Sequence, residues 1–271
     1  MMFHVEHQIF TRSSGDRPGM FVQVARRNIL KKSFVFLYPA LKLFIFVPSL
    51  CIEQTGSKRT AMAGIYLHIP YCKTRCPYCD FFTQTDQSTK SRYTDALLKE
   101  MELRKEYLEG AEVHTVYLGG GTPSLFSSDQ LSRFIDRIAD FFPLSDRAEI
   151  TIEINPDDVD KDYFRRMREA GINRLSLGTQ SFSGQELEFL GRRHDANQNH
   201  RALENALASG FENISIDLIY GLPGSTPASW QANLEKAFAY PIKHLSAYHL
   251  TIEPGTPFGI RKEKGELDEL D

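Results

Sequence analysis

Residues 113–143, VHTVYLGGGTPSLFSSDQLSRFIDRIADFFP, contain one complete strand–turn–helix unit. Val113–Leu118 is a short run rich in β-branched and aromatic residues, which predicts a strand. The glycine triplet that follows marks a tight turn. Ser127 begins a capping box that Gln130 closes, and apolar residues then recur at helical spacing until Pro143 ends the helix. The stretch therefore predicts a β-strand followed by an α-helix.

The same unit recurs along the chain. The predicted strands are Ile65–Ile69, Val113–Leu118, Glu149–Ile154, Arg174–Gly178, Asn213–Ile219 and His244–His249. One of the helices between them starts at Thr226-Pro227, a capping residue followed by proline at the first helical position. Strands that alternate with helices predict βαβ units, a parallel sheet and right-handed crossovers. Six strands are too few for an eight-stranded barrel, so the fold class is α/β, with either an open doubly wound sheet or a partial barrel.

The composition narrows the class of protein. The chain has 271 residues, 41% of them apolar, which is enough for one large core or two modest ones. Its formal net charge of −3 predicts no nucleic-acid partner. Four cysteines fit a reducing cytoplasm, where thiols remain free to bind metal.

The first 61 residues differ from the rest of the chain. They are basic and rich in aromatic residues, and they show no polar and apolar period. The apolar run 34–52 is long enough for a membrane helix, but Lys42 lies within it and two prolines interrupt it. A signal peptide lacks support because no small-residue cleavage site follows. We expect no integral membrane span, a natural start at Met62, an N-terminal extension at 1–61 outside the fold, and one core domain at 62–271.

Three of the four cysteines lie within eight residues, at Cys72, Cys76 and Cys79, with the spacing C-x3-C-x2-C. Close cysteines in a cysteine-poor chain bind metal or carry redox chemistry more often than they form a disulfide. Three thiolates can hold three corners of a four-iron cluster and leave the fourth iron open for a small molecule. Zinc with His68 as the fourth ligand is the alternative, although zinc sites usually add a second cysteine pair downstream.

Polar residues and glycines lie at or near the carboxyl ends of the predicted strands, which is where parallel α/β sheets bind ligands. Asp217 lies in an apolar run, so its carboxylate must be paired or face a ligand cavity. Arg192 can clamp a carboxylate, although the adjacent Arg193 competes for that role. Each residue taken alone also fits a tight turn, a solvated strand end or a surface arginine. Together they suit a ligand with an amine, a carboxylate and a ribose. The set is Gly119, Gly120, Gly121, Glu153, Gln180, Arg192 and Asp217.

The cysteine spacing resembles the signature of the radical S-adenosylmethionine (radical SAM) superfamily. Four further segments resemble the subgroup that contains the oxygen-independent coproporphyrinogen III dehydrogenases and the HemW-type heme chaperones. The resemblance runs from Met62 to the end of the chain. It implies a partial (β/α)6 barrel with a [4Fe-4S] cluster at its mouth. The four segments are YLHIP at 66–70, GGGTPS at 119–124, GTQSF at 178–182 and DLIYGLPG at 217–224.

The resemblance also implies roles for individual residues. The three cysteines would ligate three irons, and the methionine amine and carboxylate of S-adenosylmethionine (SAM) would bind the fourth. Arg192 matches the position that pairs with this carboxylate. The remaining matches are Gly120, Gly121, Thr122 and Glu153 around the methionine portion, Gln180 and Asp217 near the ribose, and Tyr66 and Tyr78 near the cluster and the adenine.

Phe81 separates two functions within the subgroup. The dehydrogenases carry a further cysteine two residues after the third, and here that position is Phe81. We therefore expect a chaperone that binds heme or porphyrin as cargo and passes it to an acceptor protein, with a reductant serving the cluster. The alternative is a dehydrogenase that generates a 5′-deoxyadenosyl radical, and the resemblance leaves open whether SAM is cleaved. Because the family has a further C-terminal region and this chain ends at Asp271, we expect a truncated form with a complete SAM site and an incomplete heme site.

Overall fold

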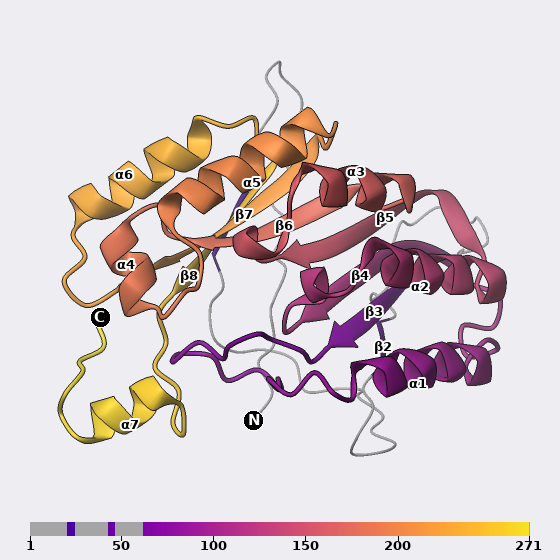
Figure 1. Ribbon diagram of the computed structural model, residues 1–271, viewed down its shortest axis with the longest axis horizontal. Helices are drawn as coiled ribbons and strands as arrows, with labels where there is room; N and C mark the ends of the chain where they lie inside the picture. Colours follow the sequence, from indigo (N-terminus) through magenta and orange to yellow (C-terminus); the bar gives the residue numbers. More distant parts are fainter. Residues whose placement is uncertain (1–20, 25–42, 47–61, 271) are drawn as a thin grey trace, which may run out of the picture.

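The structure is a computed structural model that describes residues 21–24, 43–46 and 62–270 (Figure 1). Its centre is one eight-stranded sheet with the strand order β1-β8-β7-β6-β5-β4-β3-β2. Strands β3 to β8 are parallel and follow one another in chain order. The strands are β1 (Phe21–Val24), β2 (Leu43–Phe46), β3 (Met62–Ile69), β4 (Glu112–Gly120), β5 (Leu144–Ile154), β6 (Arg174–Gln180), β7 (Asn213–Tyr220) and β8 (His244–His249).

The α/β class and the parallel sheet predicted from the sequence are confirmed, and the sheet is an open partial barrel rather than a closed one. Each of the six predicted strands is present. The largest difference is the start of β5, which lies at Leu144 rather than Glu149, because Leu144 pairs with Val113 of β4. The predicted strand contained only the apolar run, whereas the pairing extends into the polar residues before it.

Two short strands come from the N-terminal extension. Strand β1 pairs in parallel with β8, and β2 pairs antiparallel with β3, so that they occupy the two edges of the sheet. Apart from these strands, residues 1–61 lie outside the described residues, and the division of the chain at residue 62 stays a prediction. The apolar run 34–52 is described only at β2. In the described part of the chain, no helix has the length and apolarity needed to cross a membrane.

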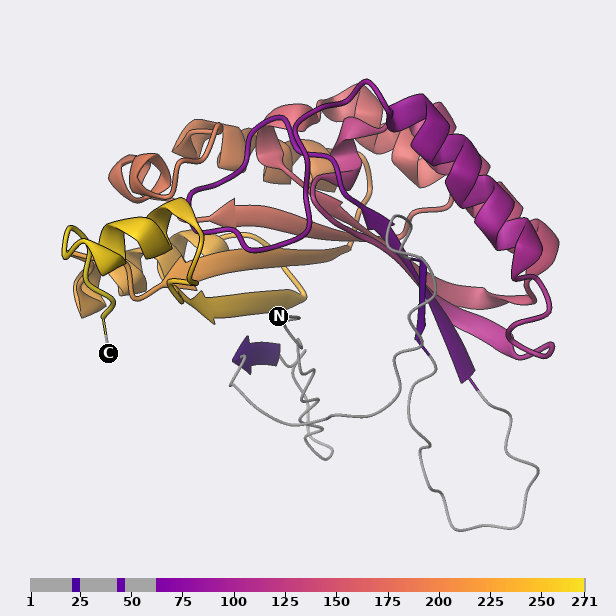
Figure 2. The same cartoon turned by 90° about the horizontal axis from the view of Figure 1, so that it is seen from below.

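The long helices cover the convex face of the curved sheet (Figure 2). The main apolar core lies between these helices and the sheet and includes Leu118, Phe134 and Ile216. The helices are α1 (Lys90–Leu103), α2 (Ser128–Phe141), α3 (Lys161–Glu169), α4 (Gly184–Phe189), α5 (Ala196–Ala208), α6 (Pro227–Phe238) and α7 (Pro257–Glu263), with short 3-10 turns at η1 (Pro123–Leu125) and η2 (Pro156–Asp158).

The opposite, concave face of the sheet is polar. Along β7, Ile214, Ile216 and Leu218 are buried in the core, whereas Ser215 and Asp217 alternate with them and point to the other face. A parallel sheet that packs on both faces has nearly continuous apolar strands. The alternation in β7 therefore marks a face that is not built to be covered by a second apolar layer.

Ser127 is the N-terminal capping residue of α2, the first long helix after the glycine turn. Its hydroxyl accepts a hydrogen bond from the Gln130 N–H at 3.3 Å, and its own N–H donates to the Gln130 side chain at 3.1 Å. Ser127→Ala leaves one of these donors without its partner, so the free energy of unfolding should fall by about 1 kcal/mol. Urea denaturation followed by circular dichroism measures this. Ser132→Ala, within the same helix, should change it by less than about 0.5 kcal/mol, and equal losses in both variants would contradict the capping role.

Candidate functional site

The cysteine loop connects β3 to α1 and lies at the carboxyl edge of the sheet. Cys72, Cys76 and Cys79 are free thiols, and each is partly buried. Backbone hydrogen bonds close the base of the loop, from Cys72 N–H to Gln84 O at 3.0 Å and from Gln84 N–H to Pro70 O at 2.7 Å. The chain therefore presents three free thiols on one short loop whose two ends are fixed.

This donor set fits a cluster better than a single metal ion. Within the described residues, no group of three or more His, Cys, Asp or Glu side chains converges closely enough to hold one ion. Both ring nitrogens of His68, the alternative zinc ligand, already have partners: Nδ1 lies 3.2 Å from the Tyr66 hydroxyl and Nε2 lies 3.0 Å from Phe82 O. A four-iron cluster takes one thiolate per iron, so its cysteines stand apart around a larger centre. Burial raises the pKa of Cys72 and of Cys79 in the metal-free protein, and metal binding requires both as thiolates.

The glycine turn after β4 packs directly against the cysteine loop. Gly121 N–H donates to Ile69 O at 2.7 Å, and a Cβ on Gly121 would lie 2.7 Å from the Tyr71 carbonyl oxygen. Glycine is thus required here because any side chain would collide with the neighbouring backbone. Thr122, the next residue, donates its hydroxyl to Cys72 Sγ at 3.4 Å. The two loops therefore form one surface.

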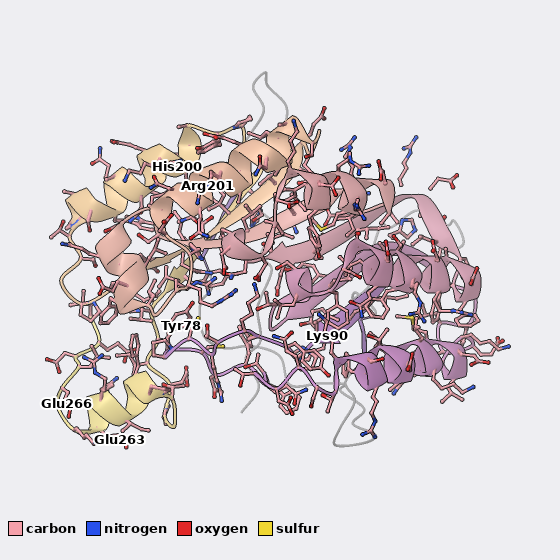
Figure 3. The ribbon with its side chains drawn as sticks, viewed as in Figure 1. Tyr78, Lys90, His200, Arg201, Glu263 and Glu266 are labelled. Atoms are coloured by element: carbon pink, nitrogen blue, oxygen red, sulfur yellow. The ribbon has the colours of Figure 1, made fainter. Side chains whose placement is uncertain are left out.

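Helix α7 supports the cysteine loop from its other side. Phe258 N–H donates to Pro77 O at 3.0 Å, and the rings of Phe258 and Tyr78 lie 6.4 Å apart. Figure 3 shows Tyr78 between the sheet and α7. These contacts belong to a second, smaller apolar cluster that includes Leu190 and Leu250. The C-terminal segment of the described chain therefore helps to position the loop.

Glu153 lies on the concave face near the end of β5. Its carboxylate accepts hydrogen bonds from the Tyr117 hydroxyl at 3.0 Å and from Gly120 N–H at 2.9 Å. Tyr117 in turn stacks on Tyr66, with ring centroids 5.9 Å apart. Burial, reinforced by the nearby Asp217 carboxylate, raises the pKa of Glu153 to about 7. A group that is costly to charge in the free protein is a good partner for a ligand cation.

Asp217 occupies the same face on β7. The Ser176 hydroxyl lies 3.3 and 3.2 Å from its two oxygens, and burial raises the pKa of Asp217 to about 6. Gln180 ends β6 with a φ of 63°, a left-handed conformation that residues other than glycine rarely adopt. Gly178 leaves room for its amide, because a Cβ there would lie 3.0 Å from Gln180 Nε2.

Arg192 reaches into the centre of the site. Its Nη1 donates to the Tyr78 hydroxyl at 3.3 Å and to Cys76 Sγ at 3.4 Å, and its Nη2 donates to Gly178 O at 3.2 Å and to the Asn155 side-chain oxygen. Its Nε is buried without a partner in the described structure. A buried guanidinium whose protein partners include no carboxylate is costly unless an anion joins it. The geometry therefore fits a ligand carboxylate or a metal-bound thiolate beside Arg192.

Arg193 points elsewhere. It forms ion pairs with Asp157 at 2.7 Å and with Asp158 at 3.1 Å. The two adjacent arginines thus have different surroundings, and Arg192 is the one that contacts the cysteine loop. This location agrees with the choice made from the resemblance, while the role of Arg192 toward a ligand stays a prediction.

The structure gathers the predicted site residues around one rim. Direct contacts link the cysteine loop to Thr122 and Arg192, and the glycine turn to Glu153. Sequence reasoning assigned no role to Tyr117 or Ser176, which hold the two carboxylates. Side chains alternate between the two faces of a strand, and this alternation along β4 and β6 places Tyr117 and Ser176 on the concave face. The same alternation in the sequence could have identified them as site residues.

The fold and the site define a class of protein, an open parallel α/β barrel with three free cysteines on one loop at the carboxyl edge of its strands. The sequence model of the radical SAM superfamily matches residues 66–237, and the chain belongs to this superfamily. The predicted family is thereby confirmed.

Within the superfamily, the chain is similar to two heme chaperones and to one solved enzyme structure. The chain is 40% identical over 208 residues to the heme chaperone HemW of Mycobacterium tuberculosis, which covers 75% of this chain and 53% of the relative. It is also 40% identical over 200 residues to HemW of Escherichia coli, covering 73% and 53%. The solved structure of coproporphyrinogen III oxidase (HemN) from E. coli, described as a radical SAM enzyme, matches with a TM-score of 0.69 and 30% identity over 77% of this chain and 48% of that chain. The chain therefore spans about half the length of the curated relatives it matches.

The two buried carboxylates predict how the stability of the metal-free protein depends on pH. The native pKa values of Glu153 and Asp217, about 7 and about 6, lie above the unfolded values of about 4.3 and 3.9. Between these values the native state binds more protons than the unfolded state, so the free energy of unfolding should fall as pH rises from about 4 to about 7. In Glu153→Gln, the fall in the free energy of unfolding between about pH 4 and pH 7 should be smaller by on the order of 2–3 kcal/mol. Urea denaturation across this pH range measures it.

Glu149→Gln is the matched control. Glu149 lies on the same strand and the same face as Glu153, but its side chain is 46% exposed. This variant should keep the wild-type slope. If Glu153→Gln also keeps that slope, Glu153 is not the buried proton-binding group.

Proposed function

We propose that residues 62–271 form the radical SAM core of a heme chaperone, which uses a [4Fe-4S] cluster and a SAM site and passes heme to an acceptor protein. The observation that carries this choice is Phe81, which stands where the dehydrogenases of the subgroup have a fourth cysteine. Phe81 is 53% exposed, so no buried packing partner requires an apolar residue there. The naming of the 40%-identical relatives as heme chaperones supports the same choice.

The chain's own residues fit the two cofactors. A bound cluster supplies one open iron and one-electron chemistry. Cys72, Cys76 and Cys79 would hold it. Arg192 would pair with the SAM carboxylate, because its buried guanidinium forms no direct ion pair with a carboxylate among the described residues and its Nε has no hydrogen-bond partner there.

The remaining SAM contacts follow from the concave face. Glu153 accepts two hydrogen bonds in the free protein and retains lone pairs for a ligand amine. Asp217 and Gln180 would contact the ribose hydroxyls, and Tyr66 and Tyr78 the region of the cluster and the adenine. The glycine turn, Gly120 and Gly121 with Thr122, would border the methionine portion. Each of these side chains then orients the ligand rather than reacting with it.

Heme, or a related porphyrin, is the proposed cargo. The names of the relatives and of the matched structure share one ligand class, the tetrapyrroles. We infer that a separate reductant serves the cluster and that the acceptor is another protein. A cytoplasmic location fits the three free thiols, because a reducing compartment keeps them available to bind metal.

The second candidate is an oxygen-independent coproporphyrinogen III dehydrogenase. The match to HemN, at 30% identity and a TM-score of 0.69, favours it. The radical chemistry would require the same cofactor residues. The two candidates therefore differ in the fate of the tetrapyrrole and not in the cluster site.

Cluster binding tests the part that both candidates share. Anaerobic reconstitution with iron and sulfide should give a brown protein with broad visible absorption. Cys76→Ala should lose the cluster, because two thiolates remain for four irons. Cys51→Ala, which changes the cysteine outside the loop, should retain it. A colourless wild-type product that holds one zinc ion would contradict the cluster, and loss of the cluster in the Cys51 variant would contradict the ligand set.

Turnover of coproporphyrinogen III separates the two candidates. The reconstituted chain with SAM and a reductant should form no vinyl product, since the subgroup's fourth cysteine is replaced by Phe81. A chimera that continues this chain with the C-terminal region of E. coli HemW should bind heme, measured as a shift of the Soret band on titration. Vinyl product from either protein would overturn the chaperone proposal in favour of the dehydrogenase.

A further inference from the structure

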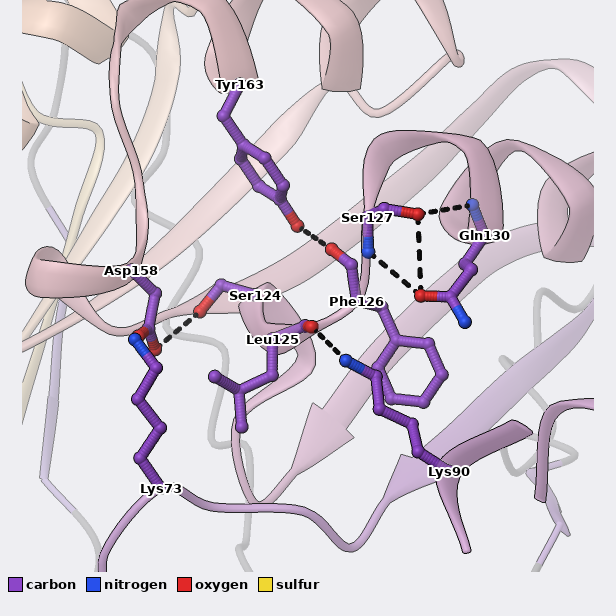
Figure 4. Close-up of a pocket in the computed structure, with 9 residues that line it drawn as sticks. All are labelled: Lys73, Lys90, Ser124, Leu125, Phe126, Ser127, Gln130, Asp158 and Tyr163. Atoms are coloured by element: carbon purple, nitrogen blue, oxygen red, sulfur yellow. Dashed lines mark hydrogen bonds and ion pairs between the residues drawn. The ribbon is translucent and has the colours of Figure 1, made fainter. Parts of the chain in front are cut away.

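Asp158 lies at a junction between the segments that build the site. It ends the short turn η2 after β5, and its side chain is only 2% exposed. Its carboxylate lies 2.6 Å from Lys73 Nζ and 3.1 Å from Arg193 Nη2, and it accepts a hydrogen bond from the Ser124 hydroxyl at 3.4 Å. Figure 4 shows Asp158 between Lys73 and Ser124 at the edge of a pocket.

Each partner of Asp158 is close in sequence to a residue of the candidate site. Lys73 directly follows the first cysteine of the loop, and Arg193 directly follows Arg192. Ser124 lies two residues after Thr122, whose hydroxyl contacts that same first cysteine. One buried carboxylate therefore connects the cysteine loop, the glycine turn and the segment that carries the buried guanidinium.

Neighbouring residues of the same turn reinforce this junction. Asn155 N–H donates to the Ser124 hydroxyl at 3.2 Å, and its side-chain oxygen accepts from Arg192. Asp157 pairs with Arg193 at 2.7 Å. The segment between β5 and α3 thus contacts both arginines directly, and Asp158 adds a direct ion pair to Lys73 of the cysteine loop.

Charged side chains of both signs surround Asp158. Lys73 pairs with Asp158, Arg193 pairs with Asp157 and Asp158, and Lys90 adds a further positive charge near Asp158 and Lys73. Side-chain exposure falls from 46% for Lys73 to 21% for Arg193 and 2% for Asp158. An exposed pair contributes little by itself, but removing the buried member of a network leaves its partners without their shared counter-charge. Asp158 is therefore the carboxylate that Lys73 and Arg193 share, and Asp157 is a second partner of Arg193.

We propose that Asp158 is a positioning residue that fixes the cysteine loop through Lys73 and fixes Arg192 through Arg193. The proposal rests on the proposed function, since it explains how the cluster and SAM sites are held in place before either cofactor binds. The carboxylate acts on these sites only through its partners. It contacts neither a predicted cluster ligand nor Arg192 itself.

Hydrogen exchange of the metal-free chain tests the proposal without any cofactor. Asp158→Asn keeps the size of the side chain and removes its charge. The amides that close the loop, Cys72 N–H and Gln84 N–H, should exchange about tenfold faster in this variant. Asp162→Asn is the matched control, because Asp162 also pairs with arginines but its side chain is 55% exposed and it lies on α3. It should leave both rates unchanged.

The reconstituted chain provides a second readout that a general loss of stability would not reproduce. Lys73→Met should speed removal of iron by a ferrous chelator about tenfold, with little change in SAM binding. Adding SAM to the reduced cluster should change its electron paramagnetic resonance spectrum. In Arg193→Met, the SAM concentration at the midpoint of this change should rise about tenfold, with little change in the rate of iron loss. Asp158→Asn should show both effects, and adding Lys73→Met to it should not speed iron loss further.

The outcomes separate this proposal from the proposed function. If exchange at Cys72 and Gln84 is the same in Asp158→Asn and in wild type, the positioning role is overturned, whether or not a cluster forms. If Lys73→Met and Arg193→Met each change both iron loss and SAM binding, Asp158 supports the fold in general and the proposal also fails. If the wild-type chain takes up no cluster, the proposed function fails, while faster exchange in Asp158→Asn would still support the junction.

Discussion

The parallel pairing of β3 with β4 is the constraint on which the site depends. Ile69 of β3 lies opposite Gly120 of β4, so the loops that follow the two strands leave the sheet at the same level. Gly121 N–H then bonds to Ile69 O, and the absence of a side chain at Gly121 lets the turn touch the backbone of the cysteine loop. Residues that lie about fifty positions apart in the chain thereby form one surface.

The concave face of the sheet carries buried charged groups that are unfavourable for the stability of the free protein. Helices cover the apolar convex face, whereas the opposite face carries Glu153 and Asp217, both with raised pKa values, and the nearby Arg192. Apolar residues at these positions would be easier to bury. Costly buried charges that share one rim are typical of ligand sites, and the ligand site proposed above would account for them.

The parts of the fold that were predictable from the sequence depend on local chemistry. The strands from Asn213 and His244 and the capping box at Ser127 follow from periodicity and caps. The rim followed from the rule that ligands meet the carboxyl ends of parallel strands. What could not be predicted depends on distances across the chain. Residue type alone does not separate Arg192 from Arg193; the resemblance chose Arg192, and only the packing shows that Arg193 pairs with Asp157 and Asp158.

The charges of the rim complement the amino-acid portion of the proposed cofactor. Arg192 forms no direct ion pair with a carboxylate among the described residues, although Asp217 is close enough to interact with its charge, so an incoming carboxylate would supply a direct counter-charge. Glu153 and Asp217 repel each other, which contributes to the raised pKa of Glu153, and an incoming amine would relieve that repulsion. A ligand that carries both groups therefore corrects two unfavourable features at once. A ligand with only one of them would leave either a buried cation or a pair of carboxylates uncompensated, and this favours a zwitterionic amino-acid group over a simple anion at this rim.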